Sequence, residues 1–322
     1  MSDRNLRIVI PGGSGQVGHI LARHFHAQGH QVTVLSRNPR AMPWEVLAWD
    51  ETPNGPWTMA LENSDLVINL AGRSVNCRYT QANRREIYSS RIRSTRLLNE
   101  VIAGLQNPPR LWLNSSTATI YRHALDRPMD EATGELGGGE PGAPDSWNFS
   151  IKVAKDWEDA FFATPTPQTR KIAMRNAITL SPDRGGAFAM LLNLVRAGLG
   201  GSMGDGDQFV SWVHGADFVR AVDWLIEHEE ISGAVNIASP SPLPNREFMC
   251  AFREAWSAPI GLPASAWMIE LGCFFMRTES ELVLKSRRVV PGRLLDAGFE
   301  FQFPEWPAAV RDLVNHWKRS QS

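Results

Sequence analysis

The fold of this chain is decided by its amino-terminal stretch, Leu6-Arg-Ile-Val-Ile-Pro-Gly-Gly-Ser-Gly-Gln-Val-Gly-His-Ile-Leu-Ala-Arg-His-Phe25. Its first five residues are rich in β-branched side chains, which favour a strand. Residues 16–28 repeat apolar side chains at helical spacing, and Gly29 follows as a cap. The stretch therefore predicts a strand, a glycine-rich turn and a helix in immediate succession.

The turn between this strand and helix has the glycine spacing of a phosphate-binding loop. Glycine permits a tight turn, close approach of the backbone to a pyrophosphate, and close packing of helix on strand. The helix amino terminus adds unpaired N–H groups and the positive end of its dipole. We therefore predict that a dinucleotide contacts Gly12, Gly13, Ser14, Gly15, Gln16, Val17 and Gly18. The alternative is a strand–helix turn that binds no ligand. Because the glycine-rich turn directly follows a strand and opens a helix, we favour dinucleotide binding.

The end of the next predicted strand, residues 31–35, indicates which dinucleotide is bound. An NAD site needs a carboxylate there to bind the ribose 2′-hydroxyl. This chain has Ser36-Arg37-Asn38 instead, and a guanidinium can pair with a 2′-phosphate and stack on adenine. The sequence thus favours NADP over NAD, with a plain surface arginine as the alternative for Arg37.

Strands and helices alternate along the rest of the chain. Strand patterns at 65–70, 110–114, 171–175 and 234–238 are interleaved with helix patterns at 82–105, 147–162 and 218–227, the last capped by Asp217. This order predicts an α/β fold with a doubly wound parallel Rossmann sheet and a small C-terminal capping lobe. We expect residues 1–182 to form the NADP-binding domain, with the sheet completed by 215–240. Residues 183–214 and 241–322 are expected to form the capping lobe on the substrate side.

Composition excludes several other classes of protein. The 322 residues contain 33 Lys and Arg against 34 Asp and Glu, so no excess positive charge is available for a nucleic acid. Three scattered cysteines predict neither a disulfide framework nor a zinc site, and we expect no metal. The amino terminus shows no secretory signal, and the apolar run 267–276 is about half a membrane span. We therefore expect a cytoplasmic protein that makes no membrane contact.

Several motifs resemble those of the extended short-chain dehydrogenase/reductase superfamily. They are the spacing Gly12-x-x-Gly15-x-x-Gly18, the segment Asn69-Leu-Ala-Gly72, and the segment Ser115-Ser-Thr-Ala-Thr-Ile-Tyr121. The chain is more closely similar to an epimerase-like branch whose reaction is not well defined. Arg78-Tyr79-Thr80 resembles the Arg-Trp-Thr of that branch, and Leu284-Lys-Ser-Arg-Arg-Val-Val-Pro291 resembles its small C-terminal domain.

The resemblance implies further contacts to the cofactor. Leu70, Ala71 and Gly72 would line the path from the adenosine to the second ribose. Glu86 and Arg91, on the long helix, would approach the cofactor from the next layer. Thr179 would lie near the nicotinamide. By analogy, the long helix would also provide the face of a homodimer.

The usual acid–base pair of the superfamily, Tyr-x-x-x-Lys, is missing from this sequence. Its spacing places both side chains on one helical face, where the lysine lowers the pKa of the phenol. The residues four positions after Tyr79, Tyr88 and Tyr121 are Asn83, Ile92 and Leu125. In the predicted helix 147–162, the matching positions hold Ser150 and Ala154. An isolated serine hydroxyl is a much weaker acid than a phenol, so the usual proton donor is absent.

Two side chains remain as catalytic candidates. Thr117 matches the catalytic Ser/Thr of the superfamily and could bind the oxygen of a substrate. Tyr121 follows in a loop that should line the pocket. The alternatives are a strand-end hydroxyl bonded to backbone for Thr117 and a packed aromatic for Tyr121. Lys152 and Lys155 flank the vacant lysine position but are rotated off its face, so we expect them to face solvent.

These observations predict one of two functions. The first is an NADP(H)-dependent oxidoreductase or epimerase-like enzyme acting on a small polar substrate beneath the lobe, with Thr117 orienting the reacting oxygen. The alternative is a non-catalytic NADP(H)-binding sensor or regulatory protein, which has kept the cofactor site and lost the catalytic pair. Turnover of NADPH with a substrate would distinguish the enzyme from the sensor.

Overall fold

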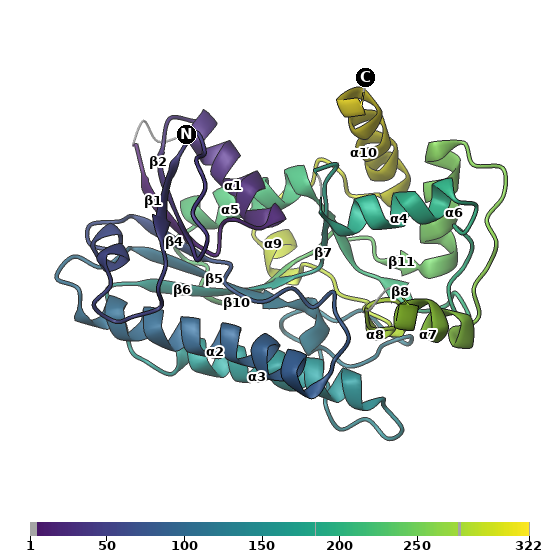
Figure 1. Ribbon diagram of the computed structural model, residues 1–322, viewed down its shortest axis with the longest axis horizontal. Helices are drawn as coiled ribbons and strands as arrows, with labels where there is room; N and C mark the ends of the chain where they lie inside the picture. Colours follow the sequence, from purple (N-terminus) through teal and green to yellow (C-terminus); the bar gives the residue numbers. More distant parts are fainter. Residues whose placement is uncertain (1–4, 184, 276–277, 322) are drawn as a thin grey trace.

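A parallel sheet forms the centre of the computed structural model, which describes residues 5–183, 185–275 and 278–321. Its seven strands follow the order β10-β6-β5-β4-β1-β2-β3, and every neighbouring pair is parallel (Figure 1). They are β1 (Arg7–Pro11), β2 (Gln31–Ser36), β3 (Glu45–Ala48), β4 (Leu66–Asn69), β5 (Leu111–Thr117), β6 (Arg170–Asn176) and β10 (Gly233–Ile237). Six of these seven strands lie at positions that the sequence predicts.

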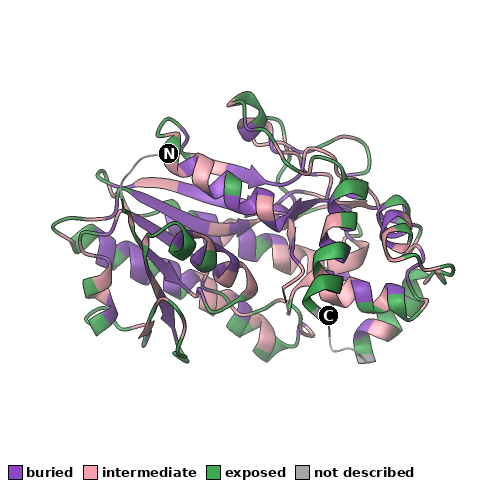
Figure 2. Ribbon diagram, turned by 90° about the horizontal axis from the view of Figure 1, so that it is seen from above, coloured by how far each residue is buried: buried purple, intermediate pink, exposed green. Residues whose placement is uncertain are grey.

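Helices cover both faces of this sheet. α1 (Gln16–Ala27) and α5 (Gly215–Glu227) lie over one face, and α2 (Gln81–Gly104) and α3 (Asp145–Phe162) lie over the other (Figure 1). Buried residues are concentrated in the strands between these two helix layers (Figure 2). Because β1 lies between β2 and β4, the chain winds away from it in two directions and leaves a crevice at the carboxyl ends of the strands. The predicted doubly wound Rossmann architecture is therefore confirmed.

Five short strands escape prediction from the sequence. One is β3, which has a single neighbour, β2, at the edge of the sheet. The others form two small sheets, in which β7 (Ile178–Leu180) pairs with β9 (Trp212–His214) and β8 (Phe209–Val210) pairs with β11 (Leu243–Pro244). Strands of two to four residues are too short to show an alternating pattern of apolar side chains.

The second half of the chain builds a smaller body beside the sheet. Its helices are α4 (Ala187–Arg196), α6 (Asn245–Trp256), α7 (Ala266–Phe275), α8 (Glu281–Leu284) and α10 (Trp306–Gln321). α9 (Gly292–Asp296) contacts β10 of the large sheet, and the 3-10 turns Pro56–Ala60 and Ala118–Ile120 lie in the first half of the chain. The separate core of the smaller body contains the buried aromatic side chains Phe188, Trp212, Phe248, Phe252 and Trp306. Leu294 and Phe299 pack instead in the core of the large sheet. The segment 241–322 therefore contributes to both cores, whereas the sequence assigns it to the lobe alone.

The predicted cap of α5 is wrong. His214 occupies the N-cap position, and its Nδ1 accepts a hydrogen bond from the backbone N–H of Ala216 at 3.1 Å. Asp217 lies in the first turn, fully buried, and its carboxylate accepts from the N–H groups of Gln302 and Phe303 at 2.7 and 2.8 Å. The carboxylate is thus used to attach the segment before α10, a contact between residues far apart in the chain.

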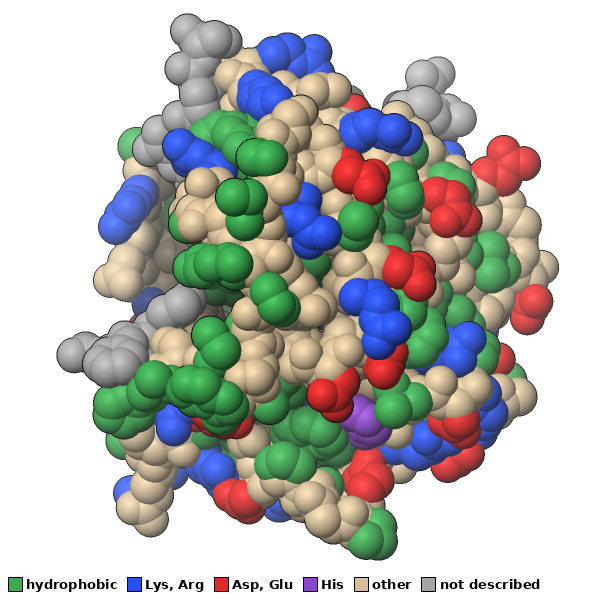
Figure 3. Space-filling view, turned by 90° about the vertical axis from the view of Figure 1, so that its right-hand side faces the viewer, with side chains coloured by type: hydrophobic (Ala, Val, Ile, Leu, Met, Phe, Trp, Pro, Cys, Tyr) green, Lys and Arg blue, Asp and Glu red, His purple; other side chains and the backbone are tan. Residues whose placement is uncertain are grey.

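The lobe exposes apolar side chains on one side of the molecule (Figure 3). Among the described residues, Trp267, Met268, Leu271 and Phe274 of α7 are exposed, as are Ile260 and Leu262 before it. α7 contains all of the apolar run 267–276 except Met276, which lies outside the described residues. Within residues 5–183, 185–275 and 278–321, no helix has the length and apolar character needed to cross a bilayer.

Candidate functional site

The glycine-rich turn between β1 and α1 is held tightly against the segment that follows β4. Gly12 has a φ of +74°, and a Cβ on it would lie 2.7 Å from the backbone of Ala71. A Cβ on Gly15 would meet open space. At the start of α1, the buried side-chain amide nitrogen of Gln16 has no hydrogen-bond partner among the described residues. At this turn the backbone of Gly12 lies close to Ala71, the space beside Gly15 is open, and the amide of Gln16 has a hydrogen-bond donor to offer. These features fit a bound pyrophosphate.

A cavity of about 380 Å³ lies on the β2 side of this turn. Gly13 and Ser14 of the turn line it, together with all three residues of the predicted Ser36-Arg37-Asn38 segment. Arg40 also lines it, and the guanidinium groups of Arg37 and Arg40 are exposed. The described lining contains no carboxylate. Two cations without an acid match a 2′-phosphate better than a 2′-hydroxyl. The contribution of Arg40 is absent from the sequence analysis because it follows the expected motif by two residues.

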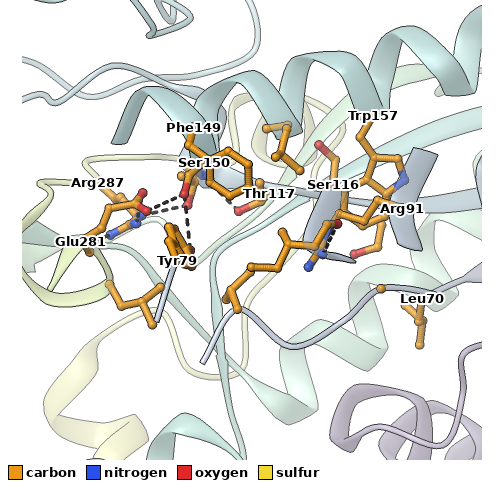
Figure 4. Close-up of a pocket in the computed structure, with 18 residues that line it drawn as sticks. Leu70, Tyr79, Arg91, Ser116, Thr117, Phe149, Ser150, Trp157, Glu281 and Arg287 are labelled. Carbon is orange, nitrogen blue, oxygen red and sulfur yellow. Dashed lines mark hydrogen bonds and ion pairs between the residues drawn. The ribbon is translucent and has the colours of Figure 1, made fainter. Parts of the chain in front are cut away.

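A second cavity, of about 190 Å³, lies at the carboxyl ends of β4 and β5 (Figure 4). The predicted residues Leu70, Gly72, Arg91 and Thr117 line it. Its other walls come from the segment before α2, from α2, α3 and the lobe, and they include Tyr79, Phe149, Ser150, Trp157, Glu281 and Arg287. The structure therefore brings the predicted catalytic threonine and the predicted path of the cofactor to one cavity.

The two catalytic candidates have different surroundings. Thr117 lines the second cavity, and its hydroxyl oxygen accepts a hydrogen bond from the N–H of Thr119 at 3.2 Å. Within the described residues its hydroxyl hydrogen has no acceptor, so it can be donated to a ligand. Tyr121 is 2% exposed and does not line the cavity. Its hydroxyl donates to Asn236 at 3.0 Å and accepts from Arg175 at 2.8 Å, and burial raises its pKa. The structure thus favours the packed-aromatic alternative for Tyr121.

Arg91 is a cation without an acidic partner. Its guanidinium donates to the carbonyl oxygen of Ile87 at 3.0 Å and lies over the ring of Trp157, with 5.1 Å between the guanidinium carbon and the ring centroid. No carboxylate among the described residues lies within ion-pair distance of it, and burial lowers its pKa to about 10. A partly buried guanidinium that has no counter-ion in the described part of the chain indicates an anion-binding position.

Three of the cofactor contacts implied by resemblance lie outside both cavities. Ala71 borders the glycine turn, and its N–H donates to the side chain of Asn69 at 3.1 Å. Glu86 is exposed and forms an ion pair with Arg73 on the surface. Thr179 lies in β7, opposite Val213. For Glu86 and Thr179, contact with a cofactor stays a prediction that this geometry does not favour.

The sequence analysis identified the vacant tyrosine position on α3 but missed the residues that surround it. Ser150, which stands there, has its hydroxyl oxygen 2.5 Å from Glu281 Oε2 and 3.4 Å from the hydroxyl of Tyr79 (Figure 4). Glu281 also pairs with Arg287 at 3.2 Å. Burial, followed by the charge of Glu281, raises the pKa of Tyr79 to about 12. These four residues come from the segment before α2, from α3 and from the lobe, so no local motif announces them.

Neither flanking lysine replaces the missing pair. Lys152 is exposed, as predicted, and its ammonium pairs with Asp156 at 2.7 Å. Lys155 is partly buried, and neither lysine lines the second cavity. Over the described parts of the chain, no cluster of His, Cys, Asp and Glu could hold a metal ion.

Known proteins resemble this chain over nearly its whole length. Residues 264–313 match a domain of unknown function, DUF1731. The epimerase family protein SDR39U1 of Bos taurus is 30% identical over 313 residues, covering 96% of this chain and all of the relative. The epimerase family protein YfhF of Bacillus subtilis is 26% identical, covering 96% and 98% of the two chains.

Solved structures give the same result. Human SDR39U1 (isoform 2), solved with NADPH, superposes with a TM-score of 0.85 at 28% identity and covers 96% of this chain and 99% of its own. UDP-N-acetylglucosamine 4-epimerase from Bacillus cereus has a TM-score of 0.72 at 17% identity, covers 97% and 96%, and shares the fold. Residues 8–238 match the NAD dependent epimerase/dehydratase family, which is more than half of the chain. The chain therefore belongs to the NAD dependent epimerase/dehydratase family.

Proposed function

We propose that this chain is an NADPH-dependent oxidoreductase that reduces a carbonyl group of a small polar substrate. The observation that carries the proposal is the placement of the two cavities at the carboxyl ends of the strands. The glycine turn lines one of them and packs against Leu70 and Ala71 beside the other. One is lined by Arg37 and Arg40, and the other by Thr117. NADPH in the related human structure supports the choice of cofactor.

The residues present fit this cofactor. Arg37 and Arg40 would bind the 2′-phosphate, and the backbone N–H groups of the turn and of the start of α1 would bind the pyrophosphate. When bound, the reduced nicotinamide supplies a hydride. Thr117 would donate a hydrogen bond to the substrate oxygen. The rings of Phe149 and Trp157 would exclude water from the second cavity.

Binding tests the choice of cofactor. NADPH and NADH are titrated into the wild type, Arg37→Ala and Arg40→Ala, with protein fluorescence as the readout. Each variant should weaken NADPH binding by about tenfold and leave NADH binding unchanged, since only the 2′-phosphate contact is lost. Arg110→Ala, an exposed arginine outside both cavities, is the matched control. Equal affinity of the wild type for both cofactors would contradict the proposal.

Turnover tests the chemistry. Loss of NADPH absorbance is followed with a panel of aldehydes, ketones and quinones, and oxidation by at least one of them is expected. Selective NADPH binding without turnover of any panel member would favour the sensor alternative. The sensor alternative is supported by the absence of the Tyr-x-x-x-Lys pair from the sequence.

A further inference from the structure

The C-terminal lobe places an acidic residue beside the position at which the superfamily has its catalytic tyrosine. Ser150 stands there on α3, and the carboxyl group of Glu281, at the start of α8, lies 2.5 Å from its hydroxyl oxygen. The two residues are 131 positions apart in the chain, and both line the second cavity (Figure 4). An acid from the lobe therefore reaches the place where the fold usually presents a phenol.

We propose that Glu281 is the general acid of this site and that it delivers its proton to the substrate oxygen through the hydroxyl of Ser150. This inference rests on the proposed function, because it supplies the proton that carbonyl reduction requires. Thr117, on the same cavity, would hold the oxygen while the proton arrives.

The surroundings of Glu281 favour a protonated carboxyl group. The side chain is 1% exposed, and burial raises its pKa. The charge of Arg287, the hydrogen bond from Ser150 and the charge of Lys285 oppose this effect, and Glu279 adds to it. Lys285 is itself buried, and burial together with Arg287 lowers its pKa to about 7, so it carries only part of a charge at neutral pH. A carboxyl group with a raised pKa can hold a proton near neutral pH and release it during the reaction.

The hydroxyl of Ser150 has the geometry of a relay. It carries one hydrogen, so it can accept from a protonated Glu281 and donate on its other side. That side now faces the Tyr79 hydroxyl at 3.4 Å, which is the long limit of a hydrogen bond. A substrate oxygen that came closer would replace this weak contact.

Tyr79 has a positioning role in this arrangement. With a pKa of about 12 it stays protonated, and its backbone N–H donates to Glu279 at 2.5 Å. The phenol of Tyr79 therefore takes no part in the proposed proton transfer.

The proposed step balances. As the carbonyl carbon accepts the hydride, the π pair of the C=O bond moves to the oxygen. That oxygen takes the hydrogen of the Ser150 hydroxyl, and the Ser150 oxygen takes the proton of Glu281. The glutamate that results is paired with Arg287 at 3.2 Å, and water reprotonates it after the alcohol leaves. The substrate gains two hydrogens, and the cofactor loses a hydride.

Infrared spectroscopy of the NADPH-loaded protein at neutral pH tests whether Glu281 holds a proton. The difference spectrum between the wild type and Glu281→Gln should contain a carboxylic-acid C=O band, and Ser150→Ala should shift that band. Glu270→Gln is the matched control, because Glu270 accepts from the Ser280 hydroxyl at 2.5 Å in the same lobe, outside the cavity. Absence of the band would overturn the inference, since an ionised carboxylate has no proton to give.

The pH dependence of stability is a second, independent readout. With a folded-state pKa above the ordinary 4.5, the folded protein holds a proton that the unfolded chain has lost. The stability of the wild type relative to Glu281→Gln should therefore fall as the pH rises above about 4.5. A difference that stays constant or rises through this range would contradict a protonated Glu281.

Kinetics separates this inference from the proposed function. With a carbonyl compound that the wild type reduces, Glu281→Gln should slow NADPH oxidation by about 100-fold or more while NADPH affinity stays within about twofold. A Glu281→Gln enzyme as fast as the wild type would overturn the inference and leave the proposed function intact. A wild type that does not bind NADPH would remove the proposed function, and the infrared band of the cofactor-free protein would still show whether Glu281 is protonated.

Discussion

Replacing Tyr121 by phenylalanine should destabilise the fold and leave the cofactor site unchanged. The lost hydroxyl links Arg175 and Asn236, which are 8% and 0% exposed. A hydrogen bond from a charged group contributes about 1.5–3 kcal/mol, and the carbonyl oxygen of Asn236 would also be left without its donor. Because Arg175 keeps two hydrogen bonds to Glu158, we expect a loss of about 2–3 kcal/mol.

Thermal unfolding measures this loss. For 322 residues that unfold together, the unfolding entropy is about 0.7 kcal/mol/K, so the Tm of Tyr121→Phe should fall by about 3–4 °C. Tyr88→Phe, which removes a phenol from the partly exposed face of α2, is the matched control and should change stability by less than about 0.5 kcal/mol. NADPH affinity and turnover should stay unchanged in Tyr121→Phe. An unchanged Tm with lost turnover would refute the structural role and restore Tyr121 as a catalytic residue.

Four further variants test other parts of the site. Arg91→Met should weaken NADPH binding by about tenfold or more without lowering the Tm, because its partly buried guanidinium has no carboxylate partner in the described part of the chain; parallel losses of affinity and Tm would contradict this. Gly12→Ala should lose about 1–3 kcal/mol in thermal unfolding because its Cβ meets the backbone of Ala71, whereas Gly15→Ala, whose Cβ meets open space, should keep its Tm and lose NADPH affinity. Relative to Lys285→Met, the wild type should gain stability as the pH rises from about 7 to 10.5, because the unfolded chain holds a proton that the folded lysine has released; a flat difference in urea unfolding would show that Lys285 stays charged.

The large sheet could be predicted because its strands carry their own signal. β1, β2 and β4 to β6 are runs of four to seven residues, mostly buried, and glycine or helix patterns follow them. β3 could not be predicted, since its four residues alternate little in burial and have a neighbour on one side only. The lobe is harder still, because its short strands and helices are held by contacts such as those of Asp217 with residues 302 and 303. A sequence pattern reports local burial and does not report which distant backbone a carboxylate will bind.

In the candidate site, too, residues within one contiguous motif could be predicted, whereas contacts between distant residues could not. The cofactor turn is one contiguous stretch, and its residues could be assigned from spacing alone, as could Ser36, Arg37 and Asn38 after the next strand. Tyr121 shows the limit of that approach, because the loop position was predicted and the direction of its side chain was not. An aromatic ring on a loop can turn into a pocket or into the core, and here Arg175 and Asn236 provide the partners that hold it in the core.

The contacts between the lobe and the sheet domain hold Glu281, the proposed acid, beside Ser150. Arg78 donates to the carbonyl oxygen of Thr278 at 3.3 Å, and the ammonium of Lys285 donates to that of Thr119 at 2.7 Å. Arg287 donates to the hydroxyl of Thr119 at 3.0 Å. Directional polar contacts of this kind fix the position of a segment more than they stabilise it. A lobe segment held in this way on both sides of the cavity can place a carboxyl group beside Ser150 as accurately as a helix places a tyrosine. The loss of the usual pair on α3 is therefore compatible with retained catalysis.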